Sequence, residues 1–497
     1  MSAGGSGWQI WIDTGGTFTD ALGLDPLGRL QRAKILSSAA LRGTIERRLS
    51  PTRITIRADW TLPDDFVRGL RFRALEGAES GPAGPGQESV VSSYDAGAAT
   101  LGLSHPPAGG LSPGALFEVV SPEEAPVLAA RLLTRTPPDR PLPVETIRLA
   151  TTLGTNALLT RQVAPTALFI TRGFADLLRI GTQQRPDLFA LEVRVPEPFY
   201  REVVEVEERL TADGAVLRPL AVALAHSHRN PEHELRLRDI LARRGFRHIS
   251  CSSELAPFIR LLPRAETVVV DACLAPVVRA YLERVRAGAG GRLHVMTSAG
   301  GLAALETIRP KDMLLSGPAG GVVGAAAAGR RAGFSRVIAF DMGGTSTDVA
   351  RYDGDYEYTF EHRVGDAHLV APSLAIESVA AGGGSVCWFD GGRLRVGPHS
   401  AGASPGPACY GAGGPLTLTD VNLLLGRLEP DRFEIPIRAD AAARALDGLA
   451  HAVRDRTGER PETDGLLAGF LEIANERMAD AIRSVSLRRG YDPADHA

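Results

Sequence analysis

Apolar and polar positions alternate along this chain with two periods, one typical of strands and one typical of helices. The short apolar run in Phe246–Ser252 indicates a strand, whereas apolar residues at helical spacing indicate helices over Glu232–Arg244, Val268–Arg286 and Leu466–Arg489. A further helix is predicted over Pro122–Thr134. Strands and helices follow one another along the chain, which is typical of an α/β protein.

Two similar short strings follow apolar runs. DTGGTFTD occupies Asp13–Asp20, DMGGTSTD occupies Asp341–Asp348, and the strings agree at six of eight positions. Each predicts a β-hairpin with a tight Gly-Gly turn, and the first hairpin is expected over Gln9–Leu24. Paired glycines let backbone N–H groups approach an oxyanion, and threonine hydroxyls add donors. Two copies therefore predict two lobes that share one phosphate chain.

The residues of the two strings receive distinct expected roles. Asp13 and Asp341 are predicted to position Mg²⁺, mainly through water, and to orient water for catalysis. For Asp20 and Asp348, a role in closing the hairpins is favoured over a catalytic role. The residues expected to contact phosphate are Gly15, Gly16, Thr17, Thr19, Gly343, Gly344 and Thr345.

Composition and charge narrow the possible functions. The 497 residues are enough for more than one hydrophobic core, and a net charge of −3 gives no basic surface for nucleic acid. Lys34 and Lys311 are the only lysines, which leaves few candidates for Schiff-base chemistry. Neither lysine follows a GxxxxG loop, so a P-loop NTPase is excluded.

Targeting signals and cysteines favour a cytoplasmic protein without membrane contact. Met1–Gln9 lacks the basic start and apolar centre of a secretory signal. The longest run of small apolar residues, Gly320–Gly329, is too short to cross a bilayer. The four cysteines contain no CxxC pair, so reduced thiols are favoured over metal ligands or disulfides.

Several glycine-rich stretches predict loops. Irregular sequence follows the first hairpin, and there Gly77–Ser89 and Ser104–Gly114 read as surface loops around short segments. Ala380–Val386 and Ser400–Gly414 are too long for simple turns and predict ordered loops where the two lobes meet.

Three helix starts are also predicted. The glycines of Ser316–Gly321 open a helix that either binds an anion at its N-terminus or packs closely on a sheet, and the two readings are equally favoured. Thr155 or Asn156 is expected to cap a helix, and LTLTDVNLLLGRL predicts a helix capped by Thr and Asp.

The two hairpins resemble the phosphate loops of the actin/hexokinase/sugar-kinase superfamily, and the flanking motifs resemble the hydantoinase A/5-oxoprolinase family. FDMGGTSTDVARYDG through PACYGAGGPLTLTD is most similar to the ATP-dependent 5-oxoprolinase branch. The motifs that carry the family resemblance are Thr151–Arg161, Thr171–Phe189, Leu314–Gly324, Ala380–Val386 and Val396–Leu428.

The resemblance implies a two-lobed α/β ATPase fold of the ribonuclease H-like kind. An N-terminal lobe is expected over residues 8–220, and a second domain with an incomplete C-terminal lobe over residues 221–497. Relatives continue beyond the equivalent of RRGYDPADHA into a strand and an FGGAGG-type loop that cradles adenosine. We therefore expect a fragment, one part of a split protein or a truncated product, which alone binds ATP weakly and turns over 5-oxoproline poorly or not at all.

The resemblance further implies an ATP-dependent hydrolase of a cyclic amide, either 5-oxoproline or a hydantoin. Transfer of the γ-phosphoryl group to the amide oxygen would produce an imidate phosphate that water attacks. The implied cofactors are ATP and Mg²⁺, with K⁺ as a further candidate. A hydantoinase B-type subunit or domain and further copies of the chain are implied partners. Two other functions stay open: the ATP-using subunit of an acetone- or acetophenone-type carboxylase, and an inactive nucleotide-binding fragment.

Several further residues are assigned through the motifs that resemble the family. Arg185 is the candidate for a substrate carboxylate, because a guanidinium group pairs bidentately with carboxylates, and Asn156 and Thr152 are further substrate candidates. Gly383 and Gly384 are candidates for nucleotide contact. Two departures from the family's pattern leave the identity of the substrate undecided. His399 stands where many relatives carry Glu, and Thr14 stands where oxoprolinases commonly carry Arg.

Overall fold

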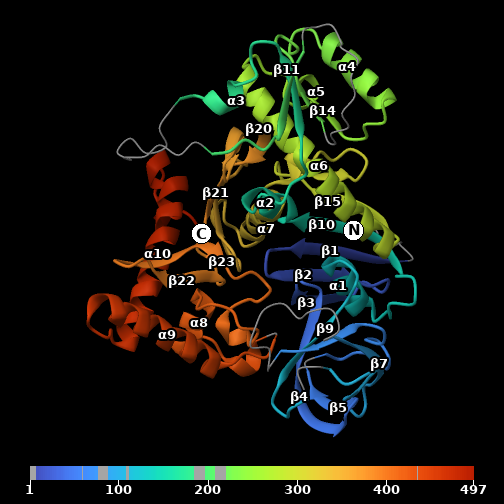
Figure 1. Ribbon diagram of the computed structural model, residues 1–497, viewed down its shortest axis with the longest axis vertical. Helices are drawn as coiled ribbons and strands as arrows, with labels where there is room; N and C mark the ends of the chain where they lie inside the picture. Colours follow the sequence, from blue (N-terminus) through green and yellow to red (C-terminus); the bar gives the residue numbers. More distant parts are fainter. Residues whose placement is uncertain are drawn as a thin grey trace.

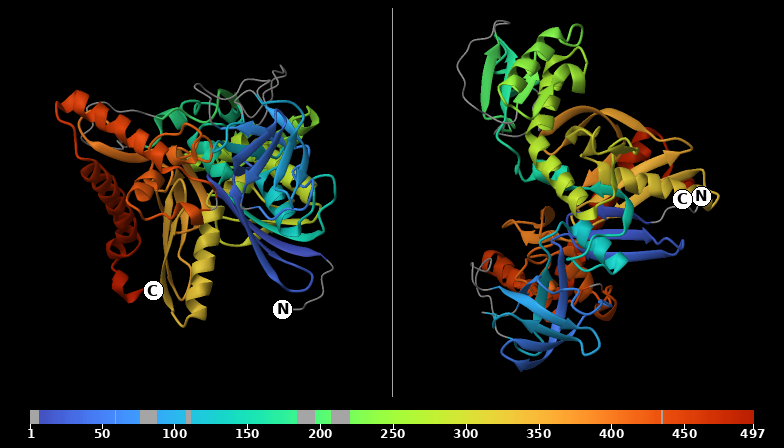
Figure 2. Two further views of the ribbon diagram at one scale, coloured as in Figure 1. Left: turned by 90° about the horizontal axis from the view of Figure 1, so that it is seen from below. Right: turned by 90° about the vertical axis from the view of Figure 1, so that its right-hand side faces the viewer.

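The computed structural model describes residues 7–58, 60–75, 88–107, 111–183, 196–206, 220–433 and 435–497. Figure 1 shows an elongated α/β molecule with a four-stranded sheet at one end and a closed barrel at the other. The right-hand view of Figure 2 shows the same arrangement, with a larger sheet between the two ends.

The central sheet has six strands in the order β16-β15-β10-β1-β2-β3. Its strands are β1 (Trp8–Thr14), β2 (Phe18–Leu24), β3 (Leu30–Leu36), β10 (Val144–Thr151), β15 (Arg292–Met296) and β16 (Leu302–Ala304). β1, β10 and β15 run parallel, whereas β2 and β3 are antiparallel to their neighbours. Ile10 and Ile12 of β1 are buried, as expected for alternate residues of a strand with one face in the core. The predicted first hairpin is confirmed.

Four helices surround this sheet: α1 (Ala125–Thr134), α2 (Leu153–Leu159), α6 (Leu261–Ala289) and α7 (Ser316–Arg331). α1 packs on β2 and β3, and α7 packs against β10 and β15. The helix predicted from Pro122 begins at Ala125, with Pro126 in the first turn, where its missing N–H leaves no hydrogen bond unmade.

The stretch of sequence between β3 and β10 contributes six strands that form a closed barrel in the order β4-β5-β8-β7-β6-β9. Its strands are β4 (Ala40–Ser50), β5 (Arg53–Arg57), β6 (Arg71–Ala74), β7 (Ser89–Asp95), β8 (Thr100–Leu103) and β9 (Leu116–Val120). The expectation of irregular structure here was wrong, because most of these strands are too short for their alternation to be recognised. Phe72 and Phe117 stack inside the barrel with ring centroids 5.3 Å apart.

The end opposite the barrel is a parallel sheet in the order β12-β11-β13-β14. Its strands are β11 (Ala167–Thr171), β12 (Glu202–Val206), β13 (Leu220–Ala223) and β14 (Ile249–Cys251), and its helices are α3 (Leu177–Ile180), α4 (Glu232–Arg243) and α5 (Ser252–Leu255). Every residue of β13 is buried, as is typical of a central parallel strand. The expected domain division after residue 220 falls within this sheet.

The 29-residue helix α6 joins the parallel sheet to the central sheet. Residues near its start, including Val268 and Ala272, belong to the core under β11 and β13. Residues near its end, including Val278 and Leu282, belong to the core of the central sheet. The helix predicted over Val268–Arg286 is therefore confirmed and extended. Within the described residues, no helix combines the length and the apolar character that crossing a bilayer requires.

Among its described residues, the C-terminal part contains three smaller sheets and three α-helices. β17 (Arg336–Met342), β18 (Thr347–Asp353) and β21 (Ile376–Val379) form one sheet, while β19 (Tyr358–Val364) pairs with β20 (Ala367–Leu374) and β22 (Ser385–Phe389) with β23 (Leu394–Ser400). The helices are α8 (Leu418–Leu424), α9 (Ala439–Thr457) and α10 (Thr463–Val485). Thr417 and Asp420 form a reciprocal capping box on α8, which confirms the predicted cap.

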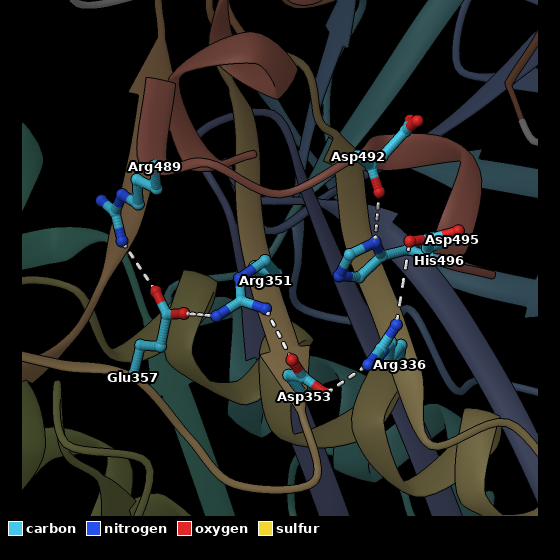
Figure 3. Close-up of polar contacts among 8 residues, drawn as sticks. All are labelled: Arg336, Arg351, Asp353, Glu357, Arg489, Asp492, Asp495 and His496. Atoms are coloured by element: carbon cyan, nitrogen blue, oxygen red, sulfur yellow. Dashed lines mark hydrogen bonds and ion pairs between the residues drawn. The ribbon is translucent and has the colours of Figure 1, made fainter. Parts of the chain in front are cut away.

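The residues after α10 lie against β17 and β18. Figure 3 shows Arg351 of β18 between Asp353 and Glu357, and Arg489 of the C-terminal tail pairs with the same Glu357 at 2.7 Å. Ala497 makes two backbone hydrogen bonds to β17, of 3.0 and 3.1 Å. The tail is therefore part of the folded structure around the second hairpin.

Candidate nucleotide site where two hairpins meet

The first hairpin places the string Asp13–Asp20 at the end of β1, in the turn and at the start of β2. The turn closes with a hydrogen bond from the Gly15 N–H to the Phe18 carbonyl (3.0 Å). Ser37 Oγ donates to the Gly15 carbonyl at 2.8 Å and lies 3.0 Å from Thr19 Oγ1. Because Thr19 is fully buried, the geometry favours a bracing role for its hydroxyl over a ligand contact.

The second hairpin, β17-β18, repeats this geometry. Its turn closes with a hydrogen bond from the Gly343 N–H to the Ser346 carbonyl (2.9 Å), three residues along as in the first hairpin. Each hairpin also pairs its first and last aspartates across the strands, Asp13 with Asp20 and Asp341 with Asp348. The similarity of the two strings therefore extends to their register.

The two turns touch each other reciprocally. A Cβ added to Gly16 would lie 2.6 Å from Thr345 Oγ1, and a Cβ added to Gly344 would overlap the side chain of Thr17. Each glycine thus leaves the space that the threonine of the other hairpin occupies. The two strings therefore lie in direct contact, and the expected sharing of one phosphate chain between them stays a prediction.

The turns present hydrogen-bond donors that the fold does not use. Among the described residues, the backbone N–H groups of Gly16, Thr17, Gly344 and Thr345 have no hydrogen-bond partner. Thr17 Oγ1 is buried and also unpartnered. Buried polar groups are normally hydrogen-bonded, so an unpartnered hydroxyl beside free N–H groups fits a site for an anionic oxygen such as phosphate.

Burial and neighbouring carboxylates raise the pKa of Asp13 and Asp348 at this junction. Solvent reaches Asp13, but protein surrounds most of it, and this burial together with Asp341, Asp20 and Asp348 raises the pKa of Asp13 to about 6. Burial, followed by the charge of Asp341, raises the pKa of Asp348 to about 6, although the hydroxyl of Ser378 opposes this shift. A bound cation would relieve this repulsion.

Helix α7 begins beside both leading aspartates. A Cβ added to Gly317 would lie 3.5 Å from Asp13 Oδ1, and one added to Gly321 would lie 3.3 Å from Asp341 Oδ2. These glycines lie four residues apart, so they share one face of the helix. The geometry supports the close-packing reading of Ser316–Gly321, because two of its glycines pack against the pair of aspartates, and the anion-binding reading stays a prediction.

The start of α2 lies against the first turn. Thr152 donates its N–H to the Thr14 carbonyl at 3.0 Å, and Asn156 Nδ2 donates to Thr152 Oγ1 at 3.2 Å. A Cβ on Gly16 would lie 3.7 Å from the same Asn156 nitrogen. Thr152 occupies the N-cap position without a side-chain cap hydrogen bond, so the expected cap at Thr155 or Asn156 was wrong; the helix begins before both residues.

The loop Ala380–Val386 packs on the second turn. The N–H groups of Gly383 and Gly384 donate to the carbonyls of Gly343 and Gly344 at 3.0 and 2.6 Å. Thr419 Oγ1 in turn donates to the Gly383 carbonyl at 2.9 Å. These two N–H groups therefore hold the turn in shape, and a direct contact of Gly383 or Gly384 with nucleotide stays a prediction.

Three further positions that the sequence singled out are Arg185, Thr14 and His399. Arg185 lies outside the described residues, so its expected contact with a substrate carboxylate stays a prediction. Thr14 Oγ1 is buried without a hydrogen-bond partner among the described residues, and His399 is exposed on β23. The bracing serine Ser37 and the aspartate neighbours Gly317 and Gly321 were not assigned, because only the folded chain brings them to the hairpins.

The residues present fit a nucleotide with a hard cation. Asp13 and Asp341 offer carboxylate oxygens, which Mg²⁺ prefers, and the free N–H groups offer donors to phosphate. No group of three or more His, Cys, Asp or Glu side chains within the described residues is placed to hold a metal ion. A cation here would therefore take its other ligands from phosphate oxygens and water, as Mg²⁺ commonly does.

Sequence comparisons identify two matching regions and several relatives. The hydantoinase/oxoprolinase family model matches residues 264–497, and the model of the hydantoinase/oxoprolinase N-terminal region matches residues 116–221. 5-Oxoprolinase 1 of Arabidopsis thaliana is 38% identical over 71% of this chain and 33% of its own length. The caprolactamase subunit alpha of Pseudomonas jessenii is 33% identical over 70% of this chain and 55% of its own length. The chain thus spans about a third of the length of the 5-oxoprolinase that it matches.

Solved structures share the fold. A nucleotide-free acetone carboxylase aligns with a TM-score of 0.68 at 22% identity, covering 98% of this chain and 64% of that one. The ATP-dependent caprolactamase of Pseudomonas jessenii aligns with a TM-score of 0.61 at 25% identity and the same coverage. The two family models together match more than half of the chain in order. With its paired hairpins and these matches, the chain belongs to the hydantoinase/oxoprolinase family.

Proposed function

We propose that this chain is the ATP-using part of an enzyme that hydrolyses a cyclic amide, with 5-oxoproline as the first candidate substrate and hydantoins or larger lactams as the others. The observation that carries the proposal is the reciprocal contact of the two turns beside Asp13 and Asp341. It places two sets of free donors and two carboxylates together, as phosphoryl transfer requires.

Coupling to ATP overcomes the resistance of an unstrained amide to water. The amide oxygen attacks the γ-phosphorus, the bond to the β-phosphate oxygen breaks, and ADP leaves. Water then adds to the activated carbon, the C–N bond breaks to leave an acyl phosphate, and a second water hydrolyses the acyl phosphate to give an amino acid and inorganic phosphate. Positioning and electrostatic stabilisation supply most of the catalysis in such transfers.

The residues divide this work between them. The N–H groups of Gly16, Thr17, Gly344 and Thr345 and the hydroxyl of Thr17 would contact phosphate oxygens. Asp13 and Asp341 would hold Mg²⁺, which neutralises phosphate charge when bound. Thr152 and Asn156, beside the first turn, would contact the substrate.

A partner polypeptide belongs to this proposal. The chain spans about a third of the 5-oxoprolinase of Arabidopsis thaliana, and another relative is named as one subunit of a caprolactamase. We therefore expect full turnover only with a hydantoinase B-type subunit or domain and the segment that encloses adenosine. Self-association and a cytoplasmic location are further expectations.

An ADP-release assay tests the proposal. The chain, alone and with the remaining length of a 5-oxoprolinase relative supplied as a separate polypeptide, would be mixed with MgATP and 5-oxoproline, hydantoin or caprolactam in turn. The expected result is lactam-dependent ADP release that needs the supplied segments. Asp13→Asn and Asp341→Asn should lower the rate at least a hundredfold, because each removes a carboxylate from the phosphate site. Asp480→Asn, a change of an exposed aspartate on α10, should leave the rate unchanged.

The outcomes separate the candidate functions. ADP release that depends on bicarbonate and a ketone instead of a lactam would indicate the carboxylase function. ATP binding without ADP release under every condition would indicate a nucleotide-binding fragment. Normal turnover by both hairpin variants would contradict the assignment of Asp13 and Asp341.

A further inference from the structure

A cavity of about 330 Å³ lies beside the central sheet, between β3, the end of α1 and the start of β4. Its size suits a small ligand. Four cationic side chains line it, Arg32, Lys34, Arg42 and Arg135, and no acidic side chain is among the described residues of its wall. Most of the remaining wall is leucine, isoleucine and alanine. The cavity therefore combines positive charge with an aliphatic surface.

Arg42 gives the cavity a buried positive charge. Its Nε donates to Glu118 Oε1 at 2.8 Å, and Arg73 binds the other oxygen of the same carboxylate at 2.5 Å. Two guanidinium groups thus share one carboxylate, which leaves the cluster with a net positive charge. Arg42 Nη2 lies 2.6 Å from the same Glu118 oxygen, and Nη1 donates to the Tyr410 carbonyl at 3.2 Å, so Arg42 contributes a fixed positive charge beside the cavity.

Arg32 and Arg135 bring two further cations to the wall. Neither has an ion-pair partner among the described residues. Arg135 also ends α1 in the left-handed backbone region, with φ of 53°, where glycine would be less strained. An arginine at a position that favours glycine is consistent with a binding role for its guanidinium group in the cavity wall.

Lys34 connects the cavity to the first hairpin. Its Nζ lies 3.5 Å from Asp20 Oδ1 and 5.0 Å from the centre of the Phe18 ring. Asp20 in turn faces Asp13 across β1 and β2. A negative group in the cavity would therefore compete with Asp20 for the charge of Lys34, next to the candidate nucleotide site.

We propose that this cavity binds a small organic anion, whose carboxylate or phosphate group meets these cations while a short apolar body packs on the aliphatic wall. The cavity is separate from the hairpin turns, and the inference does not rest on the proposed ATP chemistry.

Hexanoate, its neutral isostere hexanamide and inorganic phosphate are the probes. Trp60 lines the cavity, so its fluorescence reports binding, and Trp60→Phe identifies its part of the signal. The full chain should bind hexanoate with a Kd on the order of 1 mM, as expected for so few atoms, and hexanamide at least tenfold more weakly. Ligand-observed NMR provides a second measurement that does not depend on Trp60.

Arginine variants test whether the hexanoate-binding signal comes from the cavity. The double change Arg32→Gln and Arg135→Gln should weaken hexanoate binding about tenfold or more. Arg47→Gln, an exposed arginine of β4 outside the cavity, should leave it unchanged. Each variant's unfolding midpoint would be measured, and Arg32→Gln alone is informative if the double variant is unstable.

Each outcome bears on the inference. Binding of hexanoate but not phosphate assigns an organic anion, whereas phosphate binding that the double change abolishes assigns the charged group alone. Equal binding of hexanamide and hexanoate, or binding that the cavity variants leave unchanged, would overturn the inference. Loss of binding in Asp13→Asn but not in the cavity variants would place the anion at the hairpins and also overturn it.

Discussion

At the scale of single residues, folding makes the ionised form of Asp13 and of Asp348 at the hairpin junction less favourable. Asp13 and Asp348 each have a pKa raised to about 6, first by burial and then by neighbouring carboxylates. Folding therefore brings together charges that repel one another, as is common where a site is built to hold a cation.

Asp13→Asn should change the pH dependence of stability. Because the folded-state pKa of about 6 lies above the ordinary aspartate value of 3.8, the contribution of Asp13 to stability is fully present below pH 4. It is lost as the pH rises through 6. The variant should therefore be more stable than the parent at pH 8, by about 1 kcal/mol after allowance for the solvent that reaches Asp13. Urea unfolding at pH 8 and pH 4 without Mg²⁺ measures this; an equal gain at both values would contradict it.

Arg351→Ala should destabilise the fold around the second hairpin. Arg351 is buried and pairs with Asp353 and Glu357, so its loss leaves two partly buried carboxylates without their main partner. We expect a loss of about 1–3 kcal/mol in the free energy of unfolding.

Arg336→Ala is the matched control, because Arg336 pairs with the same Asp353 but is half exposed (Figure 3). Its loss should amount to less than about 1 kcal/mol. Urea unfolding measures both variants, and equal effects would mean that burial does not decide the contribution of this ion-pair network.

At the scale of elements, α7 contributes to the site through glycines, because their lack of a side chain leaves room for neighbouring aspartates. Gly321 leaves room for Asp341, whereas Gly324, three residues later, has no neighbouring atom within 4 Å of an added Cβ. The same substitution at the two positions therefore separates helix propensity from the demands of the site.

Gly324→Ala should stabilise the protein by up to about 1 kcal/mol, because alanine favours the helix and nothing obstructs its methyl group. Gly321→Ala has the same effect on the helix but presses on the Asp341 carboxylate. It should lower MgATP affinity about tenfold or more, as judged by calorimetry, while Gly324→Ala leaves that affinity unchanged. Equal affinities in the two variants would contradict the role given to Gly321.

The elements that could be predicted are those whose cause is local. The Gly-Gly turns, the capping box of α8 and the amphipathic helix α4 each depend on neighbouring residues, and all were predicted. The barrel was missed because its closure depends on pairing between distant strands, such as β4 with β9. Ser37, Gly317 and Gly321 could not be assigned, because their contacts exist only after β3 and α7 have packed.

At the scale of the whole molecule, the hairpin contact joins two parts of the chain with separate cores. β1 and β2 belong to the central sheet, whereas β17 and β18 belong to the sheet under α10. Thr17 and Gly344 touch directly between them, so any movement of one part relative to the other must change this contact.

Gly344→Ala should therefore destabilise the protein by about 1–3 kcal/mol, because the added methyl group overlaps Thr17. Thr17→Gly should recover most of that loss in the double variant, giving an interaction energy of about 1 kcal/mol or more in a double-mutant cycle. Denaturant unfolding measures each corner of the cycle. Gly324→Ala combined with Thr17→Gly is the control pair and should be additive.

The reciprocal fit of the two turns also constrains how such sequences can change over generations. A side chain at position 344 becomes tolerable only when position 17 has become smaller, and position 16 depends in the same way on position 345. The two halves of a duplicated motif are thereby inherited as a matched pair, although most of the chain separates them. Natural relatives that replace one of these glycines should carry a smaller residue at the opposing position, and lineages that change one partner alone should be rare.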